Sequence, residues 1–568
     1  MLSEKVKEKY LKWLNSNRIS DEEKIILKNM SEEEIDDAFF KDIEFGTGGL
    51  RGKMGPGTNR INAHLIKKLS IGYGNFLIKS NLDLLKGVVI SHDNRKNSRE
   101  YALLVSDSLN EIGINTYIFD SLRPTPELSF AVRAVKALGG IMITASHNPK
   151  TDNGFKLYNE VGTQLVPSEI EPIINEINLL GDVLDFSYKK SKIMGICRVF
   201  DKKIDEKYVN MVLKIRLDNE SKKLIKVLYS SNHGASLNSV KEVLTKANYS
   251  FEVFKEFESF DPEFSGCDAI NPEEKNSYIK PIKRAKEIGA DIILMNDPDG
   301  DRVGVAALHN NEYVLLSGNE SANLLLDYIL MKRKENGTLK ENSIVFNTVV
   351  TSHLGKKICD SYGVKLESFL TGFKYIGERI HYYETNGNVY NFVFGYEESD
   401  GCLISKEVRD KDGTQAILLY TELANYYKNM GLDLVEAYKN LEKKYGFYKS
   451  KLFNIYLRGE NGKDEIIRIL NEIRNDPILK IGDRTVTKII DYKKQKIYEI
   501  NNDIIKDYKE LPISDVIKFV FSDDSNIEIR PSGTEPKCKF YIELSSTNYI
   551  LEEEIDNIFN FLRKKYKF

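Results

Sequence analysis

The sequence of 568 residues lacks several features that define broad classes of protein. It has five cysteines, and none of them forms a CxxC pair. A sparse, odd set of cysteines argues against a disulfide framework and favours reduced thiols inside a cell. No apolar run approaches the length of a membrane span, and the first residues, MLSEKVKEKYLKWL, are too charged for a signal peptide. These absences predict a soluble, cytoplasmic protein with no membrane partner.

An excess of charge of one sign is also missing. The chain has 82 Lys and Arg residues against 85 Asp and Glu residues, for a formal net charge of −3. Because nucleic-acid-binding domains are usually strongly basic, this balance predicts no nucleic-acid partner. Any attraction for an anionic small molecule must come from local clusters of arginine and lysine. Nothing in the composition indicates the oligomeric state.

What the chain does have is a short polar loop after an apolar run, IMITASHNP, at residues 141–149. We expect a buried strand that ends near Thr144 and leaves Ser146 exposed at the strand end. A serine hydroxyl in such a place can act as a nucleophile if a neighbour activates it, and His147 and Lys156 are close in sequence. The alternative is an ordinary turn that contains serine and histidine.

A second loop, NDPDGDR, follows the apolar run DIILM and carries Asp297, Asp299 and Asp301. A tight turn through proline and glycine can aim three carboxylates at one point. Mg²⁺ accepts a few carboxylate oxygens and takes its other ligands from water or a substrate phosphate. The sequence therefore predicts a magnesium site to which Ser146, or a phosphate on it, adds a further ligand. A solvated acidic turn is the alternative, and an EF-hand is excluded because the glutamate at position twelve is missing.

Two further loops carry polar groups after apolar runs. Glu397 and Ser399 lie in GYEES, which follows NFVF, and Arg530 opens the segment RPSGTEP. This last segment could cradle a phosphate through its guanidinium, hydroxyl and backbone N–H groups. The other residues we assign to it are Ser532, Gly533 and Thr534. Taken alone, the segment is equally consistent with a plain turn.

The order of predicted elements suggests several domains. Residues 1–40 should form a helical extension that packs on the first domain through Val6, Tyr10, Leu11 and Leu14, with Trp13 also packed there. Strands then alternate with helices, one of them expected at 276–288, as in mixed, largely parallel sheets. After about residue 443 shorter alternating runs indicate an α+β domain. We expect three α/β domains, 41–208, 209–317 and 318–445, and a C-terminal α+β domain, 446–568, around a central cleft.

Taken together and in this order, TASHNP, DPDGDR, GYEES and RPSGTEP resemble the four active-site loops of the α-D-phosphohexomutase superfamily, which includes phosphoglucomutases and phosphomannomutases. RPTPELS, TGFKYIGE and the extended N-terminus look closest to the bacterial phosphoglucomutase branch related to phosphopentomutases. By the same resemblance, GTGGLRG implies an active-site role for Arg51, NGFK implies an acid/base role for Lys156, and RDKDG implies a substrate contact for Lys411. Without it, Arg51 and Lys411 could equally be solvated surface charges.

The resemblance implies a phosphoserine at residue 146, Mg²⁺ on the three aspartates, and exchange between glucose 1-phosphate and glucose 6-phosphate through glucose 1,6-bisphosphate, which also serves as activator. Arg302 and Lys156 would stabilise charge during phosphoryl transfer. Lys156, rather than His147, would take the proton of the sugar hydroxyl, and His147 would orient the serine loop. Glu397 and Ser399 would hold the sugar, and the RPSGTEP loop the distal phosphate.

Other functions remain open. Phosphomannomutase and phosphopentomutase are alternatives within the same class, although the paired glutamates of YEESDG favour glucose. A phosphatase that uses the same phosphoserine would release inorganic phosphate as substrate is consumed. If the protein were a sugar-phosphate sensor without catalytic activity, Ser146 or one of the metal-binding aspartates should be missing. All four residues are present in this sequence.

Overall fold

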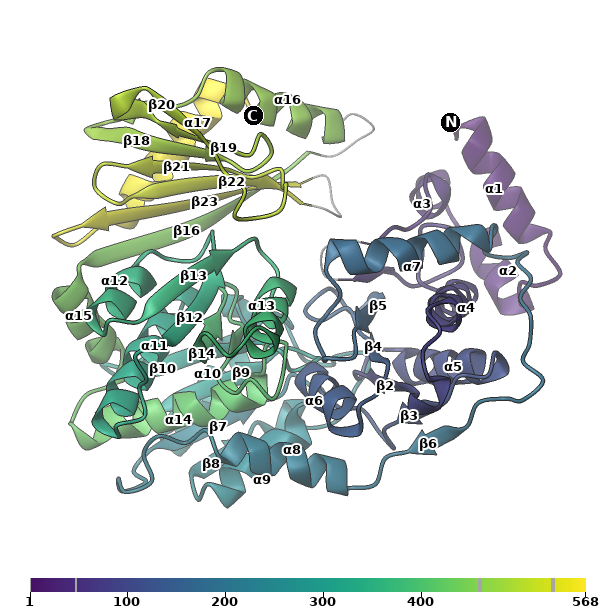
Figure 1. The fold of residues 1–568 in the computed structure, drawn as a ribbon, viewed down its shortest axis with the longest axis horizontal. Coiled ribbons are helices and arrows are strands. Elements are labelled where there is room, and N and C mark those ends of the chain that lie inside the picture. Colours follow the sequence, from purple (N-terminus) through teal and green to yellow (C-terminus); the bar gives the residue numbers. More distant parts are fainter. Residues whose placement is uncertain (1, 46–48, 458–461, 533–536) are drawn as a thin grey trace.

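The computed structural model describes residues 2–45, 49–457, 462–532 and 537–568. In chain order it contains a helical N-terminal extension and four units, each built on one sheet (Figure 1). The first three units are mixed α/β structures and the fourth is α+β, so the predicted fold class is confirmed. In the described residues, no helix is both long enough and apolar enough to cross a membrane.

The N-terminal extension consists of α1 (Glu4–Leu14), α2 (Asp21–Lys28) and α3 (Glu32–Phe39). Trp13 is only 1% exposed and packs with Phe39 and with Leu184 of the first domain, which confirms the predicted packing. The assignment of Leu11 to the packed stripe was wrong, because this side chain is 51% exposed. The short helix buries only Val6 and Trp13, and Leu11 lies outside that narrow face.

The first domain has a six-stranded sheet in the order β1-β5-β4-β2-β3-β6. Its strands are β1 (Leu50–Lys53), β2 (Val88–His92), β3 (Thr116–Ile118), β4 (Gly139–Ile143), β5 (Asp152–Tyr158) and β6 (Cys197–Val199). Its helices are α4 (Ala63–Lys79), α5 (Ser98–Glu111), α6 (Thr125–Val135) and α7 (Pro167–Leu179). One apolar cluster joins the sheet to α4, α5 and α7, and another joins it to α6. Helices therefore cover both faces, and polar loops leave the strand ends.

The second domain has the strand order β11-β10-β9-β7-β8. Its elements are α8 (Lys203–Leu213), β7 (Lys226–Ser230), α9 (Leu237–Lys246), β8 (Ser250–Val253), α10 (Ile279–Ile288), β9 (Ile292–Asn296), β10 (Val303–His309) and β11 (Glu312–Leu316). The helix expected at 276–288 begins only at Ile279, because residues 275–278 form a 3₁₀ turn. The aspartate loop connects the antiparallel strands β9 and β10.

The third domain has the strand order β13-β12-β14-β15. Its strands are β12 (Ser343–Thr348), β13 (Lys365–Phe369), β14 (Asn391–Tyr396) and β15 (Cys402–Leu403). Its helices are α11 (Gly318–Glu335), α12 (Leu354–Ser361), α13 (Lys374–Thr385), α14 (Gly413–Asn429) and α15 (Leu434–Tyr445). One continuous apolar cluster runs through the second and third domains and extends to Tyr448, Tyr492 and Tyr541 of the fourth, so the three domains pack against one another.

The fourth domain has the main strand order β16-β23-β22-β21-β18-β19-β20. Its strands are β16 (Phe447–Tyr456), β17 (Lys480–Ile481), β18 (Arg484–Asp491), β19 (Lys496–Glu499), β20 (Ile504–Asp507), β21 (Ile517–Phe521), β22 (Asn526–Pro531) and β23 (Lys537–Ser546). Helices α16 (Gly462–Asn475) and α17 (Glu552–Tyr566) share an apolar cluster with this sheet. The domain, coloured yellow-green in Figure 1, lies beside the third domain.

Candidate active site

Ser146 lies three residues beyond the end of β4, in a left-handed backbone conformation with φ of 53°. The sequence predicted an exposed serine, and this was wrong, because Ser146 is only 1% exposed. The aspartate loop of the second domain covers it. The Ser146 hydroxyl donates to Asp297 Oδ2 at 2.8 Å and lies 3.2 Å from His147 Nδ1.

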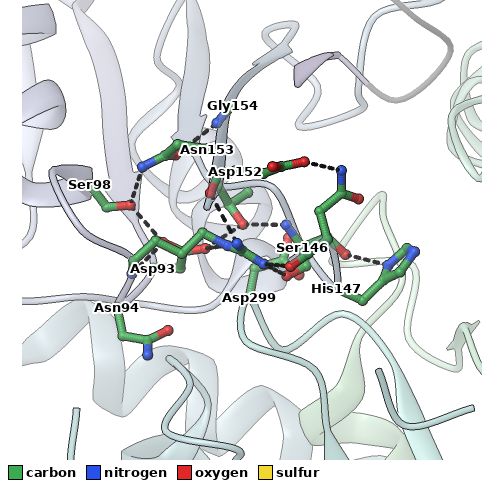
Figure 2. A network of polar contacts seen from close by, with 12 residues as sticks. Asp93, Asn94, Ser98, Ser146, His147, Asp152, Asn153, Gly154 and Asp299 are labelled. Atoms are coloured by element: carbon green, nitrogen blue, oxygen red, sulfur yellow. Dashed lines mark hydrogen bonds and ion pairs between the residues drawn. The ribbon is translucent and has the colours of Figure 1, made fainter. Parts of the chain in front are cut away.

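One guanidinium holds the serine loop in shape. Arg95 donates to four backbone carbonyls, those of Ser146, Asn148, Pro149 and Asp152, at 2.5 to 3.0 Å. Asp93 extends this support, since it accepts hydrogen bonds from Thr144 and Ser98 and pairs with Arg95; Figure 2 shows this network. Because four carbonyls of the loop point at one cation, the loop is held rigidly around the serine.

The three aspartates of the second loop form a buried cluster. Their carboxylate oxygens lie within 4.8 Å of one another, and the Oδ1 atoms of Asp299 and Asp301 have no hydrogen-bond partner among the described residues. Burial, followed by the charges of Asp299 and Asp301, raises the pKa of Asp297 well above its usual value. Close carboxylates with free oxygens are the ligand set that a hard divalent cation requires. The residues present therefore fit Mg²⁺.

Two lysines contact this cluster. Lys156 Nζ lies 2.6 Å from Asp299 Oδ2 and 3.5 Å from Asp301 Oδ2, and Lys411 Nζ lies 3.2 Å from Asp301 Oδ2. Burial raises the pKa of Asp299, but the nearby Lys156 outweighs it and the net shift is downward. Burial alone would lower the pKa of Lys411. The negative charges of Asp301 and Asp410 outweigh burial, so the net shift of its pKa is upward. Both lysines are therefore part of the acidic site.

Arginines from two domains surround His147. Burial, with the positive charges of Arg302 and Arg51, lowers the pKa of His147 well below its usual value. The imidazole beside Ser146 is consequently neutral near pH 7. Arg302 pairs with Glu273 at 2.7 Å, and the Nε atoms of Arg302 and Arg51 have no partner in the described part of the chain. These two guanidiniums retain donors for an anionic ligand.

The GYEES loop follows β14. Glu397 is 5% exposed, and its Oε1 accepts a hydrogen bond from the backbone N–H of Gly372 at 3.0 Å. Burial raises the pKa of Glu397 to about 7, and the charges of Lys411 and Arg302 oppose this shift. Ser399 is partly exposed in the same turn. Glu397 is therefore tied to the electrostatics of the aspartate cluster, and Ser399 is open to solvent.

The fourth loop joins β22 to β23. Arg530 lies with its guanidinium 5.9 Å from the centre of the Tyr541 ring, and the Ser532 N–H donates to the Lys537 carbonyl at 2.7 Å. Gly533 and Thr534 lie outside the described residues. Lys539 lies opposite Arg530 in the sheet, and the negative charges of Glu398 and Glu273 oppose the lowering of its pKa by burial. This places the strand pair that carries the loop near the second and third domains.

The sequence analysis missed three residues at this site. Thr125 donates to Asp299 Oδ2 at 2.9 Å, and Glu273 holds Arg302. Burial, with Arg530 and Lys537, lowers the pKa of Lys539 to about 8. The alternation of lysines in KCK, at 537–539, is the one sequence signal that points to this residue. Thr125 and Glu273 come from distant segments. Thr125 lies in RPTPELS, but the resemblance assigned it no role there, and no local pattern marks Glu273.

Comparison with known protein families finds one family whose domain models match most of the chain. Four phosphoglucomutase/phosphomannomutase family models match in sequence: alpha/beta/alpha domain I at residues 42–181, domain II at 206–310, domain III at 317–445 and the C-terminal domain at 487–560. The chain belongs to this family. It is thus a member of the α-D-phosphohexomutase superfamily, as its loops predicted.

Curated relatives are similar along nearly the whole chain. A phosphoglucomutase of Staphylococcus epidermidis is 34% identical over 539 residues, which cover 94% of this chain and 96% of the relative. One of Staphylococcus haemolyticus is 33% identical over 92% of this chain and 94% of its own. Solved structures show the same fold: a putative phosphomannomutase of Thermus thermophilus has a TM-score of 0.65 at 22% identity, covering 89% of this chain and 96% of its own. A Paramecium phosphoglucomutase in an open form has a TM-score of 0.66 at 18% identity, covering 93% and 96%.

Proposed function

We propose that this protein is a phosphoglucomutase that interconverts glucose 1-phosphate and glucose 6-phosphate through a phosphoserine at residue 146. The observation that carries the proposal is the buried Ser146 hydroxyl, 2.8 Å from an aspartate of a three-carboxylate cluster. Whole-length similarity to curated phosphoglucomutases supports the same reaction. The sugar would be released and rebound, or turned, as glucose 1,6-bisphosphate between the two transfers.

Asp297, Asp299 and Asp301 would hold Mg²⁺, which supplies positive charge against the transferring phosphoryl group. The chain's own residues do the rest. Arg51 and Arg302 have free guanidinium donors and stabilise the negative charge of that group. The neutral imidazole of His147 orients the Ser146 hydroxyl. Since phosphoryl transfer depends mainly on alignment and charge, the rigid serine loop is itself part of the catalysis.

We assign proton exchange with the sugar hydroxyl to Lys156. Its ammonium lies against Asp299 and Asp301, beside the place where the phosphoryl group must be. A lysine in this position can return a proton to the leaving oxygen and take one from the attacking hydroxyl. Loss of turnover in Lys156→Met with retained activity in His147→Gln would support this assignment, and the reverse result would transfer the role to His147.

Recognition of the sugar is assigned to Glu397, Ser399 and Lys411, and recognition of the distal phosphate to the loop that begins at Arg530. Ser532, Gly533 and Thr534 complete that loop. The sugar phosphate must bind in two orientations, because phosphate is transferred at either end of the sugar. The groups that bind its hydroxyls are therefore expected between the two phosphate sites. Water must be excluded while the phosphoserine exists, because its hydrolysis would turn the mutase into a phosphatase.

The test is a coupled assay with purified protein, Mg²⁺ and a trace of glucose 1,6-bisphosphate. Glucose 1-phosphate should give glucose 6-phosphate faster than mannose or ribose 1-phosphate gives its product. Inorganic phosphate should not appear as substrate is consumed. Preference for mannose or ribose 1-phosphate would reassign the substrate, and stoichiometric phosphate release would replace the mutase proposal by a phosphatase.

A further inference from the structure

The sheet of the fourth domain has an apolar face and a polar face. The apolar face, with Phe519, belongs to the cluster that also holds α16 and α17. On the polar face, Lys518 of β21 is paired in register with Glu528 of β22, and Asn526 of β22 is paired with Glu543 of β23. These four polar side chains are at most 6% exposed. In Figure 1 this domain lies directly above α12 and β13 of the third domain, which therefore shields the polar face from solvent.

The contact runs through the residues between β12 and α12. The Lys518 ammonium donates to the Val349 carbonyl at 2.9 Å and to His353 Nε2 at 2.9 Å. Glu543 Oε2 accepts the backbone N–H of His353 at 2.9 Å and the side-chain amide of Asn526 at 2.9 Å. We call this set of contacts between the third and fourth domains the domain joint.

The domain joint also contains a buried ion pair, between Lys518 and Glu528. Burial raises the pKa of Glu528 to about 7, although the charge of Lys518 opposes this shift. A buried ion pair often stabilises a fold no more than two apolar side chains of similar size would, because both charges lose their hydration. It does fix one relative placement of the domains, since a hydrogen bond needs a set distance and direction whereas apolar contact is non-directional.

On the side of the fourth domain, the joint is next to the proposed phosphate-binding loop. Glu528 and Arg530 are two residues apart in β22, so they lie on the same face of the sheet. The strand is paired with β23 from Asn526 to Pro531, and this pairing holds both residues in one rigid piece. A contact that fixes Glu528 against the third domain therefore fixes the start of the Arg530 loop as well.

On the side of the third domain, the joint is next to the GYEES loop. Val349 directly follows Thr348, the last residue of β12. The Thr348 hydroxyl donates to Oε2 of Glu398, the neighbour of Glu397, at 3.1 Å. The negative charge of Glu398 also contributes to the raised pKa of Glu528, so the loop and the joint are close in space. The joint thus connects the strand that carries the Arg530 loop to a residue that supports the sugar-recognition loop.

We propose that Lys518 is a positioning residue for phosphosugar binding, whose bonds to Val349 and Glu528 set the distance between the GYEES loop and the Arg530 loop. The proposal rests on the proposed function, and Lys518 itself is assigned no contact with substrate. A bound sugar phosphate must reach from one loop to the other, so a displaced Arg530 loop weakens binding. Phosphoryl transfer takes place at Ser146, between the first two domains, and should proceed normally once substrate is bound.

The first test compares the steady-state kinetics of Lys518→Met with those of the wild type. KM for glucose 1-phosphate should rise about tenfold while kcat changes less than about threefold, because binding is weakened and transfer is not. In an Arg530→Ala background, Lys518→Met should raise KM little further, because its effect passes through that loop. An unchanged KM in the single variant, or full additivity with Arg530→Ala, would overturn the proposal.

The chain offers a matched control for this test. Lys357 of α12 pairs with Asp524 across the same two domains at 2.8 Å, but both side chains are about half exposed. Exposed ion pairs contribute little to stability or placement. Lys357→Met should therefore leave both kinetic constants unchanged.

A double variant separates positioning from stability. Lys518→Met combined with Glu528→Met replaces the buried charges by apolar side chains, which should restore most of the free energy of unfolding measured with denaturant. KM should stay high, because neither methionine can donate to the Val349 carbonyl. Recovery of KM together with stability would show a purely structural role and overturn the proposal. If Lys518→Met alone does not fold, this double variant, which lacks the unpaired Glu528 carboxylate, decides.

Calorimetry tests binding without turnover. Titration of glucose 6-phosphate in the presence of EDTA should give a Kd about tenfold higher for Lys518→Met than for the wild type, with Lys357→Met at the wild-type value. Equal affinities in all three proteins would refute the positioning role. A wild type that binds glucose 6-phosphate but has no mutase activity would instead refute the proposed function, and the affinities would still decide the role of Lys518.

Discussion

At the scale of single residues, the strongest constraint is on the Ser146 hydroxyl, which is buried and bonded to Asp297. We expect Ser146→Ala to lower kcat by about a thousandfold or more, because the proposed phosphoserine could no longer form. The coupled assay measures this loss, and thermal unfolding checks that the fold is kept. Substantial residual mutase activity in a folded variant would show that Ser146 is not the nucleophile.

Glu397 gives a prediction on pH and stability. Burial raises its pKa to about 7, so the fold favours the protonated acid. Its contribution to stability is fully present below the unfolded pKa and is lost as pH rises through about 7. Glu397→Gln, which cannot ionise, should therefore increase the free energy of unfolding at pH 8 by about 2 kcal/mol and change it little at pH 5. Denaturant unfolding at both pH values measures the difference; an equal effect at both would contradict the assigned cause.

At the scale of elements, the conformation of the serine loop depends on the Arg95 guanidinium, which donates hydrogen bonds to four of its backbone carbonyls. Lysine has one ammonium and cannot reproduce this geometry. Arg95→Lys should lower kcat on the order of 100-fold, because the loop that carries Ser146 shifts, while KM changes little. The steady-state assay measures both constants. Arg99→Lys, at an exposed arginine of α5 that contacts one carbonyl, is the matched control and should leave kcat unchanged.

Elements and loops differed in how far the sequence predicted them. The strands before Ser146 and Asp297 were clear because buried parallel and mixed strands are continuous apolar runs. Local patterns also indicated the aspartate cluster, since its three ligands lie in one turn. The burial of Ser146 was missed because it depends on contact with Asp297, which is 151 positions away. Thr125, Glu273 and Lys539 were missed for the same reason: their roles come from packing between domains.

At the scale of the whole molecule, the site for the cation lies between two domains. Three carboxylates come from the second domain, and the Ser146 hydroxyl that meets them comes from the first. A ligand bound to the folded state alone stabilises it, so saturating Mg²⁺ should raise the Tm by about 2–4 °C. Differential scanning calorimetry with EDTA and with Mg²⁺ measures the shift. Asp299→Asn should lose most of it, and an undiminished shift in this variant would place the cation elsewhere.

The pairing of β16 with β23 has a consequence for synthesis on the ribosome. These strands open and nearly close the fourth domain, and they are matched from Phe447 with Ser546 to Tyr456 with Lys537. The first strand therefore stays unpaired along that edge until residues 537–546 have been translated. Ser146 and the aspartate loop are made long before. A premature stop ahead of Lys537 would leave Ser146 and its acidic neighbours intact but β16 without its partner, and such a truncated product would be prone to aggregation through that open edge.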